Sequence, residues 1–286
     1  MGMDAALNPL EQQLIEGYKK LFKKCPDWAY PVAPAIPFVG NNYPMEGGGV
    51  LVYASAENLS YTWPKGEQAW NEAMWQQQLP NVRPWFDPDK DPMLRSRNML
   101  AVSPGTTKVH IEPINNGSLL LAANHALKCA KLNQPEWSSA TEFLDHIAVA
   151  NPGKFSIRSS RNEDYAGNNC PCCWAPSIPF IQNDLMLLRP SVIIAPKSVV
   201  ESLRHQSIGI DLNVANCKLL PNYQITRGTI NRQIKKQLKD LGAPAPAPLN
   251  KPDWPLSRGA EKWGMENYLQ WIDLVASKWM QPPMPT

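Results

Sequence analysis

A carboxylate and an amide that follow a short apolar run are the first candidates for chemistry in this chain. Glycines 47–49 precede the run Val50–Tyr53, and Glu57 and Asn58 come shortly after it. A buried parallel strand delivers polar groups to the carboxyl edge of its sheet, where open α/β folds keep their sites. Glu57 and Asn58 are therefore candidate catalytic residues that position or activate water; a cap on the next loop is the alternative. The neighbouring side chains that could bind substrate are Ser55 and Tyr61.

A pair of amides follows a second predicted strand at 108–112. Asn115 and Asn116 could read the edge of a nucleobase, because an amide presents a hydrogen-bond donor beside an acceptor. The dipeptide Asn116-Gly117 is also a common turn signal, so a plain turn over 113–117 is the alternative interpretation.

Three cysteines lie within four residues, at Cys170, Cys172 and Cys173. Together with one of the other three cysteines they could supply four thiolates to zinc or to an iron–sulfur cluster. The sequence has no second Cys-x-x-Cys pair to complete such a site. Reduced structural thiols and no cofactor are the expectation, with a metal or cluster as the alternative.

A polar and basic segment near residue 222 leads into a predicted helix over 230–241. Its basic residues follow one another without an intervening acid until Asp240, so they could contact phosphates of a nucleic acid. A solvated helix face is the alternative. The candidate nucleic-acid-binding residues are Tyr223, Gln224, Thr226, Arg227 and Arg232.

Composition excludes several classes and leaves the partner open. The formal charge of +3, from 28 basic and 25 acidic residues, is too slight to identify a nucleic-acid partner. No apolar run approaches the roughly 20 residues that a membrane span needs, and the first residues have no signal-peptide pattern. We therefore expect a cytoplasmic protein without a membrane partner. Since there is no phosphate-binding Gly-Lys loop, dinucleotide fingerprint or nucleophile elbow, kinases, P-loop enzymes and common hydrolases are poor fits.

The elements that must position these residues alternate between helix and strand. Asn8, Pro9 and Glu11 form a helix start signal, and Cys25-Pro26 ends that helix. Such alternation indicates a mostly parallel sheet with helices on both faces. The later predicted helices cover 67–79, 118–132, 139–150, 178–188, 197–203 and 230–241; the predicted strands cover 50–53, 108–112, 155–158, 191–195 and 216–220; and 80–107 is predicted to be a loop.

The same patterns divide the chain. Residues 1–242 are predicted to form a single α/β domain, including the N-terminal helix and a Pro-rich lead-in to the first strand. The alternating Ala-Pro segment makes 243–257 a stiff linker. Residues 258–286 contain an amphipathic helix that we expect to pack back on the domain.

Three segments carry a resemblance to a known family. They are Pro37–Tyr43, the strand Val50–Tyr53, and Leu188–Ala195 followed by a short helix. In this order they resemble the uracil-DNA glycosylase superfamily, particularly its divergent glycosylase-like members, over roughly residues 36–241. The resemblance implies a three-layer αβα sandwich with a mostly parallel four-stranded central sheet. It also implies a protein that flips a modified base such as uracil out of DNA and hydrolyses its N-glycosidic bond. We expect the protein to be a monomer.

The resemblance also assigns roles to positions. It places the water-handling motif at Ala54–Asn58, the base-reading amide at Asn115 or Asn116, and the DNA-inserting loop at 222–227. The family has glycine where Ala54 stands, and its late loop carries a histidine that 222–227 lacks. The glycosylase hypothesis therefore has two alternatives: a noncatalytic nucleic-acid-binding protein on the same fold, and a hydrolase of nucleoside-type small molecules.

Overall fold

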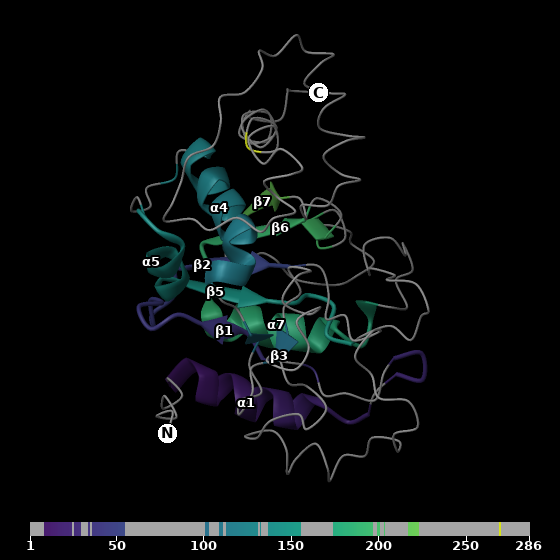
Figure 1. Ribbon diagram of the computed structural model, residues 1–286. Coiled ribbons are helices and arrows are strands. Elements are labelled where there is room, and N and C mark those ends of the chain that lie inside the picture. Colours follow the sequence, from purple (N-terminus) through teal and green to yellow (C-terminus); the bar gives the residue numbers. More distant parts are fainter. Residues whose placement is uncertain are drawn as a thin grey trace, which may run out of the picture.

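The computed structural model describes residues 9–24, 26–29, 34, 36–54, 101–102, 109–110, 113–130, 132, 137–155, 174–196, 199–200, 203, 217–222 and 269. Within these ranges the chain is an α/β protein with one five-stranded sheet and helices that pack against it (Figure 1). The predicted first helix is confirmed as α1 (Pro9–Leu21). It buries Leu10, Leu14 and Tyr18 and carries Lys19 and Lys20 in its last turn, where cations suit the helix dipole.

The sheet has the strand order β1-β5-β2-β6-β7. Strands β5, β2, β6 and β7 are parallel to one another, and β1 pairs antiparallel with β5 at one edge. All four residues of β2 are buried, as expected for a central strand that is covered on both faces. The strands are β1 (Phe38–Val39), β2 (Val50–Tyr53), β5 (Ile147–Ala150), β6 (Val192–Pro196) and β7 (Lys218–Asn222).

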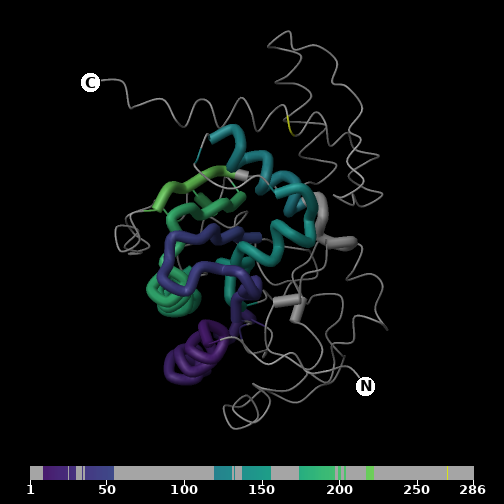
Figure 2. The backbone as a smooth tube through the Cα atoms, turned by 90° about the vertical axis from the view of Figure 1, so that its left-hand side faces the viewer, coloured from purple at the N-terminus to yellow at the C-terminus, as the bar shows by residue number. Residues whose placement is uncertain are grey.

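Alternate residues of β2 face two separate hydrophobic clusters. Val50 and Val52 belong to a cluster shared with helices α4 (Pro113–Cys129) and α5 (Ala140–Asp145). Leu51 and Tyr53 belong to the other cluster, which includes residues of α1 and of α7 (Ile178–Leu188). Figure 2 shows α1 beside α7 on one side of the strands and α4 on the other. Helices thus cover both faces of the sheet.

The helix predicted over 139–150 is wrong in its second half. Its start is confirmed: the Ser139 hydroxyl accepts from the Glu142 backbone N–H at 3.2 Å and caps α5. The helix ends at Asp145, and 147–150 is strand β5, which fits between β1 and β2. Four consecutive apolar residues show no periodicity that would distinguish a strand from a helix. Residues 147–150 form a strand because they pair with β1 and β2 in the sheet.

The second predicted strand, 108–112, is not part of the main sheet. Val109–His110 forms strand β4, which pairs antiparallel with β3 (Ala101–Val102) in a separate two-stranded sheet. Part of the predicted 80–107 loop is therefore a strand. The segment 113–117, predicted to turn, is the first part of helix α4, because Pro113 suits a first helical position.

The remaining predicted elements fare as follows. The helix 178–188 and the strands near 191–195 and 216–220 are confirmed as α7, β6 and β7. Val199, Val200 and Leu203 are helical, in agreement with the short helix predicted at 197–203. Phe155 is not in a strand, and the rest of 155–158 lies outside the described residues, as do the predicted helices at 67–79 and 230–241. Leu269 is helical and buried in the cluster under α4.

Candidate functional site at the carboxyl edge of the sheet

The connections of the parallel strands identify the part of the sheet edge where a ligand site is expected. The chain leaves β2 and next enters β5 on one side of it, then crosses to β6 on the other side. Ligands of open α/β sheets bind outside the carboxyl ends of the strands where the order reverses in this way. That point lies between the ends of β2 and β6, at Tyr53, Ala54 and Pro196.

Asn151, directly after β5, is the most informative side chain at this edge. Its residue is 2% exposed, and among the described residues neither Nδ2 nor Oδ1 of its amide has a hydrogen-bond partner. Ala54, at the end of the neighbouring β2, donates its N–H to the Ala150 carbonyl at 2.9 Å, so Asn151 and the end of β2 are adjacent. A buried polar group without a partner costs about 1–3 kcal/mol, and such groups in native structures call for an explanation.

The loop that carries Asn151 is anchored by a buried ion pair. Lys154 Nζ lies 2.5 Å from Asp184 Oδ2 on α7, and both side chains are 0% exposed. Tyr18 of α1 donates its hydroxyl to the same carboxylate, at 2.9 Å from Oδ1. The Lys154 backbone N–H donates to Ser177 Oγ at 3.0 Å. The loop 151–155 is thereby fixed to α1 and α7, and Asn151 is held on a rigid support.

Burial sets the protonation of two groups in this region. Burial raises the pKa of Asp184, although Lys154 and the Tyr18 hydroxyl oppose that shift. Burial, with a contribution from the Asp184 charge, raises the pKa of Tyr53 well above its ordinary value. The Tyr53 hydroxyl has no hydrogen-bond partner in the part of the chain that the structure describes. A neutral phenol at the end of β2 can donate a hydrogen bond but cannot act as a base near neutral pH.

The glycines that precede β2 serve the opposite edge of the sheet. Gly47 and Gly48 have φ values of 95° and 88°, which side chains rarely adopt. The Gly48 N–H donates to the Arg189 carbonyl at 2.8 Å, and the Ser191 hydroxyl donates to the Gly48 carbonyl at 2.5 Å. Tyr43 donates to the Leu188 carbonyl at 2.9 Å. These bonds join the loops that enter β2 and β6, so the glycines are structural.

The residues predicted from sequence divide into two groups. Asn115 and Asn116 lie at the start of α4, which follows β4 and not a strand of the main sheet, so the expected position at that sheet's edge is wrong. Sequence reasoning missed Asn151, although the turn signal Asn151-Pro152-Gly153 after an apolar run could have ended a strand there. The other candidates lie outside the described residues: Ser55, Glu57, Asn58, Tyr61, Cys170, Cys172, Cys173, Tyr223, Gln224, Thr226, Arg227 and Arg232.

The described part of the chain contains no group of three or more His, Cys, Asp or Glu side chains that could hold a metal ion. No helix in these ranges is long and apolar enough to cross a membrane. Neither a protein-family model nor a curated protein matches the sequence. The geometry of the carboxyl edge is therefore the basis for any functional proposal.

Proposed function

We propose that this protein is a uracil-DNA glycosylase-like enzyme that binds nucleic acid and hydrolyses the N-glycosidic bond of a modified base such as uracil. The proposed site is the carboxyl edge of the sheet, at the ends of β2, β5 and β6. The observation that carries the proposal is the buried, unpartnered amide of Asn151. An amide that offers one donor and one acceptor complements a pyrimidine edge that offers an acceptor and a donor.

The fold supports this proposal. Four parallel strands with helices packed on both faces fit a three-layer αβα sandwich, with β1 as an added two-residue edge strand. In this arrangement Asn151 takes the base-reading role that the sequence alone gave to Asn115 or Asn116. Glu57 and Asn58 follow β2 in the chain and are the proposed water-handling residues. Asn222 ends β7, and the proposed DNA-contacting segment Tyr223–Arg227 follows it.

A noncatalytic nucleic-acid-binding protein is the second candidate. The specific observation in its favour is that 222–227 has no histidine to stabilise the departing base. Under this alternative Asn151 would still read a base, but no bond would be broken.

Excision assays on the full chain test the first candidate. Duplex and single-stranded oligonucleotides with one uracil, hypoxanthine or xanthine are incubated with the protein, and abasic sites are detected by alkaline cleavage. We expect Asn151→Ala to lower excision by about 100-fold or more, the usual cost of removing a polar group that contacts the reacting part of a substrate. Asn151→Asp keeps the size but loses the donor, and it should also be impaired.

Asn183 offers a matched control, because it is also a buried asparagine with an unpartnered Nδ2, but it lies on α7. Asn183→Ala should leave excision nearly unchanged. Loss of product in Glu57→Ala or Asn58→Ala would support their water-handling role. Salt-sensitive binding without any product would favour the noncatalytic candidate, and failure to bind nucleic acid would exclude both.

A further inference from the structure

The loop that carries Asn151 is enclosed over its whole length. All of its residues, 151–155, are buried. Loops normally run over the surface of a protein, because their backbone polar groups need partners that a core does not supply. Two kinds of side-chain contact hold this loop among the described residues: a polar contact at Lys154 and an aromatic contact at Phe155.

The polar contact is the buried ion pair. Lys154 Nζ lies 2.5 Å from Asp184 Oδ2, and neither side chain is exposed. The Tyr18 hydroxyl lies within hydrogen-bond distance of both oxygens of that carboxylate, at 2.9 and 3.1 Å. The Lys154 ammonium group also lies 5.4 Å from the centroid of the Tyr18 ring. Since Lys154 follows Asn151 by only three residues, the position of the ion pair limits where Asn151 can lie.

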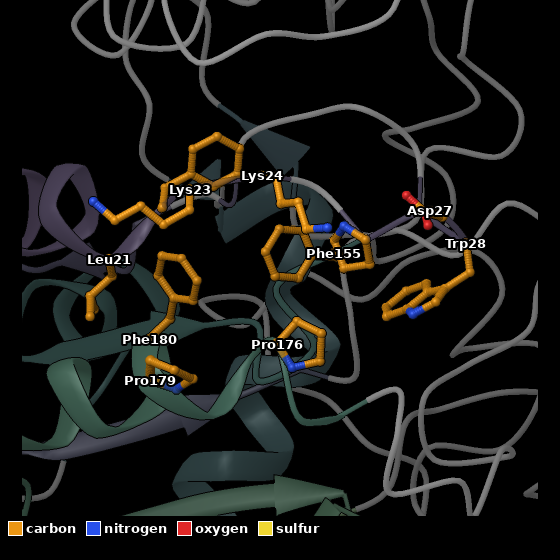
Figure 3. Close-up of a pocket in the computed structure, with 11 residues that line it drawn as sticks. Leu21, Lys23, Lys24, Asp27, Trp28, Phe155, Pro176, Pro179 and Phe180 are labelled. Carbon is orange, nitrogen blue, oxygen red and sulfur yellow. The ribbon is translucent and has the colours of Figure 1, made fainter.

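The aromatic contact leaves the loop room to move. The centroid of the Phe155 ring lies 6.4 Å from that of Phe22 and 5.9 Å from that of Phe180. Phe155 and Phe180 also line a cavity of about 450 Å³ beside the end of α1 (Figure 3). A ring beside an unfilled volume shifts more readily than a group that is packed on every side. The polar contact at Lys154 is therefore the one that specifies the position of the loop.

An ion pair is an expensive way to fill buried space. Both charges lose their hydration, and apolar residues of similar volume often stabilise a protein as well or better. What the charges add is a defined geometry, because the pair is favourable only over a narrow range of distances and orientations. This geometry is imposed three residues away from Asn151. Displacement of a reacting or reading group by about 1 Å can lower a catalytic rate by about 100-fold.

We propose that Lys154 and Asp184 are positioning residues for the amide of Asn151, and that Tyr18 extends this support to helix α1. The inference rests on the proposed function, since it assigns the residues that hold the base-reading amide in place. All three are at most 1% exposed, so they act on the substrate only through Asn151. Affinity for nucleic acid comes largely from phosphate contacts, which buried residues do not make. The support therefore acts on kcat and leaves KM nearly unchanged.

Excision kinetics of K154M/D184L in the full chain test the proposal. This double variant replaces the pair with apolar side chains and retains the backbone hydrogen bond from residue 154 to Ser177. We expect kcat for uracil excision to fall by about 10- to 100-fold with KM nearly unchanged. The matched control is Leu120→Ala, which lowers stability from the opposite face of the sheet and should leave kcat unchanged. Equal losses of kcat in the two variants would overturn the proposal, since general destabilisation would explain both.

Deuterium uptake, followed by mass spectrometry, measures the order of the loop without reference to activity. Peptides that cover 151–155 should exchange faster in K154M/D184L than in the parent chain, relative to peptides from β2. In Leu120→Ala this relative rate should not change. Parent-like exchange at 151–155 in the double variant would overturn the proposal, as would a parent-like kcat.

Tyr18→Phe is a milder variant that keeps the proposal testable if the double variant does not fold. It removes the hydroxyl that donates to Asp184 and keeps the ring, which packs against Phe180 with centroids 4.9 Å apart. Its kcat should fall less than that of the double variant, with faster exchange at 151–155. A parent-like kcat and parent-like exchange would overturn the support from α1.

The outcomes distinguish this inference from the proposed function. Excision that depends on Asn151 but not on Lys154 and Asp184 would leave the proposed function standing and refute the positioning role. A parent chain that excises no base, but whose exchange at 151–155 depends on the ion pair, would refute only the catalytic proposal. If neither excision nor this dependence is found, both proposals fail. Thermal unfolding of each variant verifies that it is folded at the temperature of the assay.

Discussion

The helices on the two faces of the sheet bury different kinds of side chain. The described buried residues of α4 and α5 include one polar side chain, the neutral amide of Asn124, and no charged one. Between α1, α7 and the sheet lie a buried carboxylate and a buried ammonium group, Asp184 and Lys154, with the Tyr18 hydroxyl between helices. An apolar face requires only well-filled volume, whereas a charged pair accepts very few geometries. The face that supports Asn151 is the one whose geometry is specified by charge.

Asp184→Ala should have the largest effect on stability. It leaves the Lys154 ammonium buried without its partner, which typically costs about 3–5 kcal/mol of unfolding free energy. Urea denaturation of the variant measures the loss. The double variant K154M/D184L replaces the pair with apolar side chains and should recover most of the stability. A double variant as unstable as the single one would show that packing, and not charge, explains the site.

Leu120→Ala probes the apolar face and should cost about 2–5 kcal/mol through lost burial and a cavity. Leu120 is 0% exposed and belongs to the cluster under α4 and α5. Unlike the loss in Asp184→Ala, this loss of stability, measured by urea denaturation, should not be recovered by a second substitution at a neighbouring residue.

The effect of Gly17→Ala on stability should have opposite signs in the parent chain and in the Asn183→Ala variant. Glycine inside a helix costs about 0.5–1 kcal/mol relative to alanine, but a methyl group at Gly17 would overlap the Asn183 amide of α7. Alone, the substitution should therefore destabilise the protein by separating α1 from α7. In an Asn183→Ala background it should stabilise by about 0.5–1 kcal/mol. A double-mutant cycle by urea denaturation measures the coupling, and additive effects would contradict the predicted overlap.

The smallest expected effect is a pH dependence of the stability that Asp184 contributes. Because the pKa of Asp184 is raised above 3.8, the folded protein keeps this proton at pH values where the unfolded chain has released it. The corresponding stability is fully present below about pH 3.8 and is lost as pH rises through the raised pKa. The stability of the parent chain minus that of Asp184→Asn should therefore decrease with rising pH above this value. A difference that stays constant with pH would show that the carboxyl pKa is not raised.

Elements with a distinct local pattern were predictable from the sequence. The N-cap signal with Pro9 located α1, and apolar runs located β2 and β6. Strand β5 was not predictable in the same way, because Ile147–Ala150 is apolar throughout and follows a capped helix without a glycine or proline between them. Its identity as a strand depends on pairing with β1 and β2, which are far away in the sequence.

That one error moved the candidate site. With 147–150 interpreted as helix, Asn151 follows no predicted strand, and the sequence indicates Asn115 and Asn116, which follow the predicted strand 108–112. That such an edge exists was predictable, because parallel strands bring their carboxyl ends together whichever residues form them. Which side chain lies there depends on register and strand order, and these are set by pairing at long range.

The strand order has a consequence for the way the chain is made. Strand β2 lies at the centre of the sheet, yet both of its neighbours come much later, at 147–150 and 192–196. Strand β1 also pairs with β5, which is synthesised more than 100 residues later. While the ribosome is still adding the first half of the chain, the buried residues of β2 have none of their sheet partners. Strand β2 is thus made early and enclosed late, and the growing chain must keep that segment from pairing with other molecules until residue 196 has emerged.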